Sequence, residues 1–246
     1  MSEWFEDWFA SEQYLNVYKH RDQKDALLLL DLIHKTISLK KDFLILDAAC
    51  GAGRYSNLLL QRGYKVIGFD LSLPLLKIAK AEAEKIFGEN IYFKSDIRTT
   101  KLKMKFNLIL NVFTSFGYFV TDEENFSFIN NSITFLKKKG YFVFDYINKQ
   151  YLIDNLIPYS QKKVDGYLIE EKRKIENQRV IKEIDISKGR ERNSFTESVK
   201  LYSPEILFEK FSKSGYKIID VFGSYKGESF SENNSSRLII IGQNEQ

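Results

Sequence analysis

The sequence predicts an α/β fold: a doubly wound, seven-stranded and mostly parallel sheet with a small antiparallel β lid. Three observations predict it. Between residues 43 and 146, short apolar runs of strand length alternate with segments of helical period, as in parallel sheets with right-handed crossovers. Acidic residues, Asp47, Asp70 and Asp96, follow three of these runs. Between residues 165 and 202 the helical period is lost and strand-like alternation replaces it.

The N-terminal residues 1–22 are predicted to form a helical cap segment. Trp4, Phe5, Trp8 and Phe9 recur at the spacing of one apolar helix face. The stretch that follows, YLNVYKHRD, is more polar. Residues 23–38 then carry leucines and isoleucines over a broad face, which predicts a helix with a buried side.

The alternation of apolar runs and helical segments from residue 43 onward predicts the strands and helices of the central sheet. Glycines at 63, 88 and 140 follow the three helical segments and are expected to end them. The continuous apolar character of the strands indicates burial on both faces of a parallel sheet. The predicted strands are 43–48, 64–69, 91–94, 106–112 and 141–146, and the predicted helices are 54–62, 73–87 and 122–138.

The C-terminal part changes character. In residues 180–187, Val180, Ile184 and Ile186 share one face with Lys182, which predicts half-exposed antiparallel strands. A helix is predicted at 204–213, with Ser203 as its N-cap. Strands at 216–222 and 237–241 complete the sheet. We therefore expect one main domain, residues 23–150 and 203–246, interrupted by an antiparallel β insertion at 151–202 that lies over the open end of the sheet.

Composition excludes several classes of protein. The 246 residues carry a net charge of +4, and acids are interspersed with the basic residues, which argues against a nucleic-acid partner. One cysteine permits no intrachain disulfide. The N-terminus lacks a signal-peptide pattern and no apolar run is long enough to span a membrane. We expect a cytoplasmic protein without membrane contact, a monomer or a homodimer.

The loop after the first central strand indicates a ligand. In LILDAACGAGRYS, residues 44–56, Gly51 and Gly53 let the backbone approach a bound molecule closely. The third glycine of a dinucleotide fingerprint and the Gly-Lys-Ser/Thr of a P-loop are both missing. An acid at Asp47 would repel phosphates and suits an amino-bearing group instead.

Two further acids extend this interpretation. Asp70 ends the second strand, where a carboxylate can accept hydrogen bonds from a ribose diol. Asp96 follows the third strand, and its carboxylate can accept a hydrogen bond from an exocyclic amine such as that of adenine. Together with the glycine loop, the three acids predict a site for a nucleoside that carries an amino acid and no phosphates.

These motifs resemble class I S-adenosylmethionine-dependent methyltransferases, in particular a bacterial small-molecule subgroup with an antiparallel β insertion. The resemblance implies a Rossmann-like sheet whose last strand is antiparallel. One departure is Asn107, where an aspartate is often found, and we expect it to cap a strand start. The motifs are DAACGAGRYS (47–56), GFDLS (68–72), SDIR (95–98), FNLILNVFTSFGYF (106–119), YLNVYKHRD (14–22) and ESVKLY (197–202).

The resemblance implies residues that hold the nucleoside part of S-adenosyl-L-methionine. Asp70 would bind the ribose hydroxyls, with Leu71 beside the adenine. Asp96 and Ile97 would hold the adenine edge.

The resemblance also implies residues around the methionine part. The loop 47–53 would face it, and Asn111 and Phe113 would lie along the sulfonium side. Three cap residues would close over the cofactor, and the third would pair with its carboxylate. The loop residues concerned are Asp47, Ala48, Gly51 and Gly53, and the cap residues are Tyr14, Tyr18 and Arg21.

The implied activity is methyl transfer to the nitrogen or oxygen of a small-molecule acceptor, with S-adenosyl-L-homocysteine as product. His20, Tyr118 and Asp145 are the candidate catalytic residues, and no metal site is predicted. Two alternatives stay open: a methyltransferase that acts on RNA or a protein terminus, and a non-catalytic S-adenosylmethionine-binding protein. A nicotinamide-dependent oxidoreductase is disfavoured by the missing third glycine.

Overall fold

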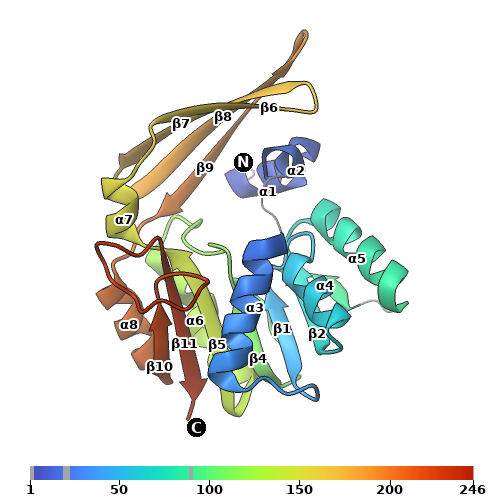
Figure 1. Cartoon of the computed structure of the whole chain (residues 1–246), viewed down its shortest axis with the longest axis vertical. Helices are drawn as coiled ribbons and strands as arrows, with labels where there is room; N and C mark the ends of the chain where they lie inside the picture. Colours follow the sequence, from blue (N-terminus) through green and yellow to red (C-terminus); the bar gives the residue numbers. More distant parts are fainter. Residues whose placement is uncertain (1–2, 19–22, 89–90, 246) are drawn as a thin grey trace.

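A seven-stranded mixed sheet forms the centre of the computed structural model, which describes residues 3–18, 23–88 and 91–245. The strand order is β10-β11-β5-β4-β1-β2-β3 (Figure 1). The pairs among β1 to β5 are parallel, whereas β11 is antiparallel to both of its neighbours. The predicted fold class is therefore confirmed. The strands are β1 Leu44–Ala48, β2 Lys65–Asp70, β3 Tyr92–Lys94, β4 Phe106–Asn111, β5 Leu136–Ile147, β10 Tyr216–Phe222 and β11 Arg237–Asn244.

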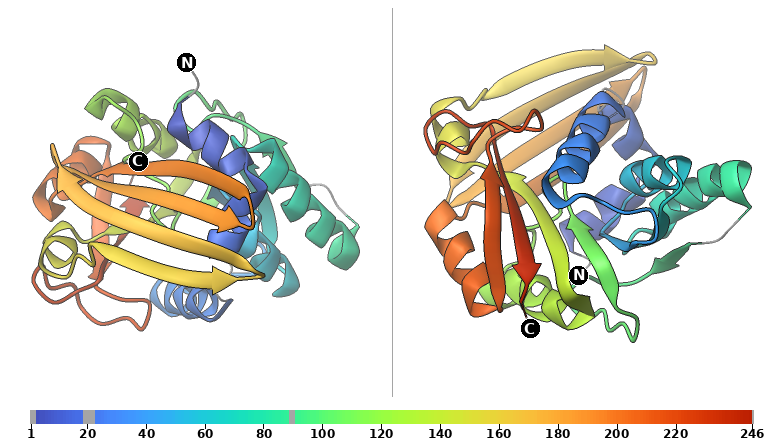
Figure 2. Two further views of the ribbon diagram at one scale, coloured as in Figure 1. Left: turned by 90° about the horizontal axis from the view of Figure 1, so that it is seen from above. Right: turned by 60° about the horizontal axis from the view of Figure 1, so that its bottom comes forward.

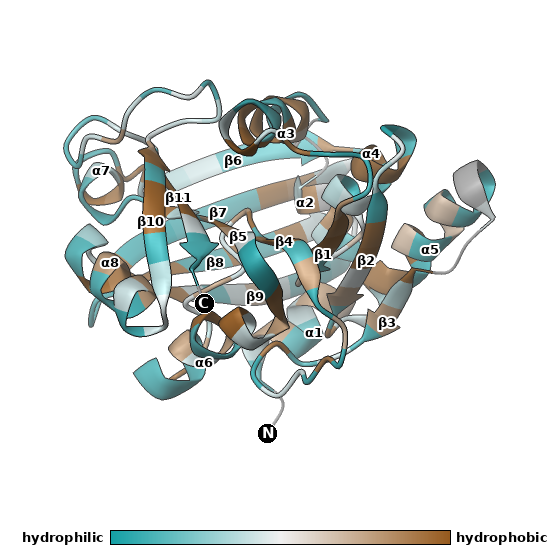
Figure 3. Cartoon of the chain, turned by 90° about the horizontal axis from the view of Figure 1, so that it is seen from below, coloured by the Kyte–Doolittle hydropathy of each residue, from teal (hydrophilic) through white to brown (hydrophobic). Residues whose placement is uncertain are grey.

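Helices cover both faces of this sheet, which explains the continuous apolar strands. One face packs against α3 Gln23–Ile37, α4 Arg54–Gln61 and α5 Leu73–Phe87, and the other against α6 Asp122–Ser132 and α8 Pro204–Lys213. Figure 2 shows the two groups on opposite sides of the strands. In Figure 3 the apolar colour of β1 contrasts with the hydrophilic colour along much of β6.

The helix predicted at 122–138 is shorter than expected. It ends at Ser132, a 3-10 turn covers Ile133–Phe135, and β5 begins at Leu136. The prediction was wrong here because the segment from Asn130 to Thr134 contains poor helix formers. Ser132 donates its hydroxyl back to the carbonyl of Ile129 at 2.9 Å, which competes with helix continuation. Gly140 thus lies within a strand, not at a helix end.

A second sheet forms the lid. Its four strands are antiparallel in the order β6-β7-β8-β9 and span most of residues 159–200, as the alternation predicted. The short helix α7 Lys149–Asp154 leads into it and was not predicted. Figure 1 shows α1 Trp4–Ala10 and α2 Glu12–Tyr18 between this lid and the main sheet. The strands are β6 Tyr159–Val164, β7 Tyr167–Glu176, β8 Arg179–Lys188 and β9 Glu191–Lys200.

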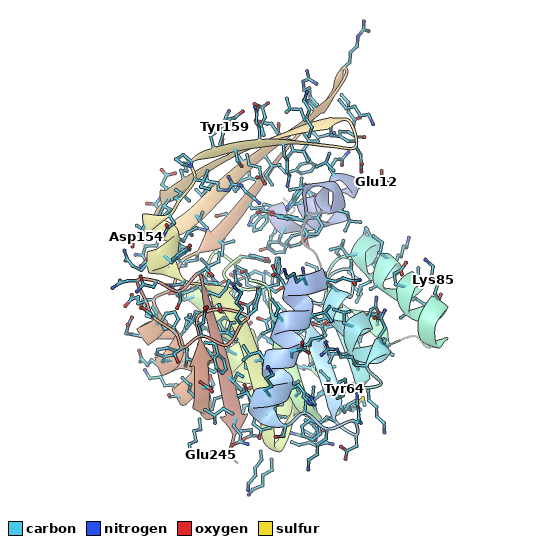
Figure 4. The ribbon with its side chains drawn as sticks, in the orientation of Figure 1. Glu12, Tyr64, Lys85, Asp154, Tyr159 and Glu245 are labelled. Carbon is cyan, nitrogen blue, oxygen red and sulfur yellow. The ribbon has the colours of Figure 1, made fainter. Side chains whose placement is uncertain are left out.

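The inner face of the lid packs on the N-terminal helices. Ile184 and Ile186 are buried against Trp8, whose side chain is fully enclosed, and Val17 joins the same cluster. Tyr159 lies on the outer side of the lid, away from α1 and α2 (Figure 4). The face predicted for Val180, Ile184 and Ile186 is therefore the inward one. Among the described residues, no helix is long and apolar enough to cross a membrane.

Candidate functional site

A cavity of about 680 Å³ lies beyond the carboxyl ends of the parallel strands. Its walls come from α1 and α2, the glycine loop, the segments after β2, β3 and β4, and the inner face of the lid. This is where open α/β sheets bind ligands. Tyr64, which directly precedes β2, and Glu245 lie at the opposite end of the sheet (Figure 4).

The glycine loop requires glycine for two different reasons. Gly51 lines the cavity with a φ of 56°, and a Cβ there would meet nothing nearer than 3.9 Å, so its backbone conformation is the constraint. Gly53 has a φ of 77° and precedes α4. A Cβ on Gly53 would lie 2.5 Å from the Tyr92 hydroxyl and 2.8 Å from Ala79. Gly53 therefore lets α4 pack closely and does not itself line the cavity.

Asp47 and Asp70 lie side by side at the floor of the cavity, on neighbouring strands. Asp70 is held by two backbone amides, since Gly51 donates to Oδ2 and Ser72 to Oδ1, both at 2.8 Å. Asp47 accepts from the backbone amide and hydroxyl of Ser56. Burial raises the pKa of both carboxyls, that of Asp47 to about 6. Both side chains keep oxygen lone pairs for a ligand.

Asp96 belongs to an ion-pair cluster at the same edge. Burial raises the pKa of its carboxyl, but the hydrogen bonds and charge of Arg98 outweigh this and leave the pKa below its usual range. Arg98 also pairs with Glu3 at 2.8 Å and with Glu124 at 3.2 Å. The cluster therefore fixes the N-terminal helix above the third strand. Asp96 and its neighbour Ile97 both line the cavity.

The loop after β4 is held in a strained conformation by Asp145. Phe113 and Thr114 both have a φ of 64°, which is uncommon for side chains of this kind. The amide of Phe113 donates to Asp145 Oδ2 at 2.8 Å, and that of Thr114 donates to the Asp145 carbonyl at 3.0 Å. Asp145 also pairs with Arg237 at 2.8 Å and is fully buried. Asp145 thus shapes the cavity wall without lining it.

The N-terminal helices are tied to the lid through one carboxylate. Glu197 accepts from Trp8 Nε1 at 2.7 Å and from the Tyr18 hydroxyl, and it pairs with Lys182 at 2.6 Å. Tyr14 packs on Trp8 and on Tyr18 with ring centroids 5.4 and 5.0 Å apart. These contacts close the cavity on the side that faces away from the main sheet.

The cavity brings together most of the residues predicted for the cofactor. Ala48, Gly53 and Asn111 do not line it: Asn111 is buried and donates from Nδ2 to the Ala48 carbonyl at 3.2 Å. Those that line it are Tyr14, Tyr18, Asp47, Gly51, Asp70, Leu71, Asp96, Ile97 and Phe113. Arg21 lies outside the described residues, so the prediction for its role stays a prediction.

The three catalytic candidates have different placements. Tyr118 lines the cavity and packs edge-on against Trp4, with ring centroids 5.3 Å apart. Asp145 is enclosed as described above, and His20 lies outside the described residues. Asn107 accepts from the amide of Leu44 at 2.9 Å, so it caps the start of β1 as expected.

Several cavity residues were missed from the sequence. Lys182 stood out on the apolar face of β8, and a charge on an inward face was the available signal. Arg54 is a basic residue in the first turn of α4, where the helix dipole disfavours it. Glu197 opens the motif ESVKLY, but that motif did not mark it as a cavity residue, and Arg237 comes from a distant strand and had no local signal.

Comparisons with known proteins agree with this architecture. Residues 45–140 match a protein family described as a methyltransferase domain. The uncharacterized protein MJ0638 of Methanocaldococcus jannaschii is 32% identical over 124 residues, which are 50% of this chain and 49% of that protein. The chain thus spans about half the length of the curated relatives it matches.

Solved structures resemble the whole chain. An S-adenosylmethionine-dependent methyltransferase from Clostridium acetobutylicum ATCC 824 has a TM-score of 0.82, with 18% identity over 98% of this chain and 99% of that one. The sugar N-methyltransferase KedS8 from Streptoalloteichus sp ATCC 53650 has a TM-score of 0.74, with 13% identity over 96% of this chain and 93% of its own. The chain has the class I S-adenosylmethionine-dependent methyltransferase fold.

Proposed function

We propose that the protein is an S-adenosyl-L-methionine-dependent methyltransferase that acts on a nitrogen or oxygen of a small molecule and releases S-adenosyl-L-homocysteine. The observation that carries the proposal is the position of Asp70. Its carboxylate lies in the cavity, is fixed by the amides of Gly51 and Ser72, and is flanked by Asp47 and Asp96 on the adjacent strands.

The residues present fit this cofactor. Each Asp70 oxygen accepts one backbone hydrogen bond and has a lone pair left for a hydroxyl of a ribose diol. Asp47 places negative charge beside the glycine loop, which suits an amino group and disfavours a pyrophosphate. Leu71 and Ile97 line the cavity next to two of these acids and would contact an adenine ring.

The bound cofactor would supply an activated methyl group. The contribution of the chain is then to hold the acceptor in line with that group and to exclude water, and such positioning can be worth roughly 7–11 kcal/mol. The contacts of Glu197 with Trp8 and Lys182 close the cavity and serve this exclusion. Asp145 is engaged in three interactions behind the wall, so we assign it a positioning role for the loop at Phe113 and Thr114.

The enclosure favours a small acceptor over a polymer. In this proposal residues 23–150 and 203–246 bind the cofactor, and the insertion at 151–202 covers the acceptor together with the cap segment 1–22. The likeness to a sugar N-methyltransferase supports a small-molecule acceptor and leaves the acceptor itself open.

The test is a calorimetric titration of the purified protein with S-adenosylmethionine, S-adenosylhomocysteine and NAD. We expect micromolar binding of the first two and none of NAD. Asp70→Ala should weaken that binding at least tenfold. The matched control is Asp31→Ala, whose carboxylate lies on α3 and pairs with Arg62 on the surface.

Three results would contradict the proposal at different levels. If the folded protein does not bind S-adenosylmethionine, the cofactor assignment fails. If it binds tightly but releases no S-adenosylhomocysteine with any amine, hydroxyl or carboxylate acceptor, a binding protein without transferase activity is the better description. Turnover with RNA or protein alone would replace the small-molecule acceptor.

A further inference from the structure

One wall of the cavity presents more hydrogen-bond donors than acceptors. We call it the arginine subsite: Arg54, Tyr55, Thr114 and Arg237, all of which line the cavity. They come from the start of α4, the loop after β4 and the start of β11. Within the described residues, their interactions leave several hydrogen-bond donors without an acceptor.

Tyr55 is the clearest of these donors. Its side chain is 4% exposed, and its hydroxyl is enclosed with no hydrogen-bond partner among the described residues. Burial raises the pKa of this phenol, so the hydroxyl stays protonated and can donate. A buried polar group without a partner is uncommon and calls for a physical explanation.

Arg54 supplies a cation beside the Tyr55 ring. Its guanidinium carbon lies 4.3 Å from the centre of the Phe113 ring and 5.0 Å from that of Tyr55. Within the described part of the chain it forms no ion pair, in contrast to Arg98 and Arg173, which bind carboxylates directly. Stacking fixes the plane of the guanidinium and leaves its N–H groups for a ligand.

Arg237 and Thr114 each contribute a further hydrogen-bond donor to the subsite. Arg237 donates from Nε to Asp145 and from Nη2 to the Thr114 hydroxyl oxygen, both at 2.8 Å. No acceptor for Arg237 Nη1 or for the Thr114 hydroxyl proton lies among the residues that the structure describes. Burial opposes the charge of Arg237, but Asp145 beside it outweighs this and raises its pKa, so the guanidinium stays charged.

Two members of the arginine subsite, Thr114 and Arg237, lie apart from the three acids assigned to the cofactor, whereas Arg54 and Tyr55 follow the glycine loop and lie nearer to Asp47. Asp47 and Asp70 lie at the ends of β1 and β2, and Asp96 follows β3. Thr114 lies in the loop after β4 and Arg237 begins β11, and these two strands are on the other side of β1 in the sheet order. Asp145 neutralises Arg237, so Arg54 contributes the remaining positive charge. A single negative charge would complement such a wall.

We propose that the arginine subsite binds a carboxylate of the methyl acceptor, with Arg54 and Tyr55 as its direct ligands and Thr114 and Arg237 as further donors. The substrate class is therefore a small acid that carries its nucleophilic nitrogen or oxygen at some distance from the carboxylate. This inference rests on the proposed function. Planar guanidinium groups and hydroxyls are suited to the two oxygens of a carboxylate.

The test compares acids with their uncharged amides on the protein saturated with S-adenosylhomocysteine. The probes are acetate, benzoate, 2-aminobenzoate and succinate, titrated by ligand-observed NMR. We expect at least one acid to bind at least tenfold more tightly than its amide. Arg54→Gln should abolish this preference. Tyr55→Phe should weaken the binding of the same acid about three- to tenfold.

Controls separate this proposal from the cofactor assignment. Arg62→Gln, at the other end of α4, and Tyr216→Phe, in the opposite core, should leave acid binding unchanged. Binding of S-adenosylhomocysteine is measured in every variant, and we expect it to stay within about twofold of wild type.

Three outcomes would overturn the proposal while the cofactor assignment stands. The first is that no acid binds better than its amide. The second is that Arg54→Gln and Tyr55→Phe leave the preference for the acid intact. The third is that both variants weaken the binding of S-adenosylhomocysteine as much as they weaken the binding of the acid. In the last case the subsite holds the carboxylate of the cofactor itself. Failure of S-adenosylhomocysteine to bind wild-type protein would count against the proposed function instead.

Discussion

The enclosed hydroxyl of Tyr55 leads to a prediction of unusual sign. Replacing a buried tyrosine with phenylalanine usually removes a hydrogen bond and destabilises the protein. Here the hydroxyl has no partner among the described residues, so the native protein without ligand bears the desolvation penalty of an unmatched polar group. Such a penalty is about 1–3 kcal/mol. Tyr55→Phe should therefore raise the free energy of unfolding of the ligand-free protein by about 1 kcal/mol or more.

The assay is urea unfolding of ligand-free protein, followed by circular dichroism, together with a thermal melt. For a chain of this length, 1 kcal/mol corresponds to a shift of about 2–4 °C in the melting temperature. Tyr216→Phe is the matched comparison, because its side chain is similarly buried and its hydroxyl lies 2.6 Å from that of Ser132. The free energy of unfolding of that variant should fall by about 1 kcal/mol.

A loss of stability in Tyr55→Phe equal to that in Tyr216→Phe would refute the reasoning. It would mean that the Tyr55 hydroxyl is hydrogen-bonded in solution, for example by an ordered water. The arginine subsite would then have one fewer donor available to a ligand, and the argument for a bound carboxylate would be weaker.

Two further predictions concern the glycine loop and its strand. Burial raises the pKa of Asp47 from its ordinary value of 3.8 to about 6, so between about pH 4 and 6 the native state holds a proton that the unfolded state has lost. The free energy of unfolding should fall by ~3 kcal/mol as the pH rises through this window, and Asp47→Asn should remove that slope in urea titrations; parallel curves for the two proteins would contradict the assignment. Gly53→Ala should lower the free energy of unfolding by about 2–5 kcal/mol. The added Cβ would overlap Tyr92 and Ala79, and the backbone at this position has a positive φ. Gly63→Ala, at a φ of 76° with nothing within 4 Å, should cost only the backbone share of about 1–2 kcal/mol, and equal losses would show that packing is not the reason for Gly53.

Much of the fold was predictable because its signals are local. Strand runs, helix periods and the glycines after α4 and α5 depend on neighbouring residues, and the parallel connections follow from chirality. Asp47, Asp70 and Asp96 could be grouped in advance because the carboxyl ends of parallel strands meet at one edge of a sheet. The end of α6 was missed because weak propensities between Asn130 and Thr134 competed with an apolar pattern that continues into β5.

The walls of the cavity depend on contacts that no local pattern encodes. The pair of Arg237 with Thr114 joins residues 123 positions apart, and that of Trp8 with Glu197 joins residues 189 apart. The sequence by itself determined the sheet, its strand ends and the acids placed there, since these follow from backbone periodicity. Tertiary packing alone decided that the Tyr55 hydroxyl has no hydrogen-bond partner among the described residues, that Asp145 lies behind the wall and that Arg54 faces the cavity. The physical reason is that a side chain's hydrogen-bond partners and exposure are set by whatever the rest of the chain packs around it, which backbone periodicity does not specify.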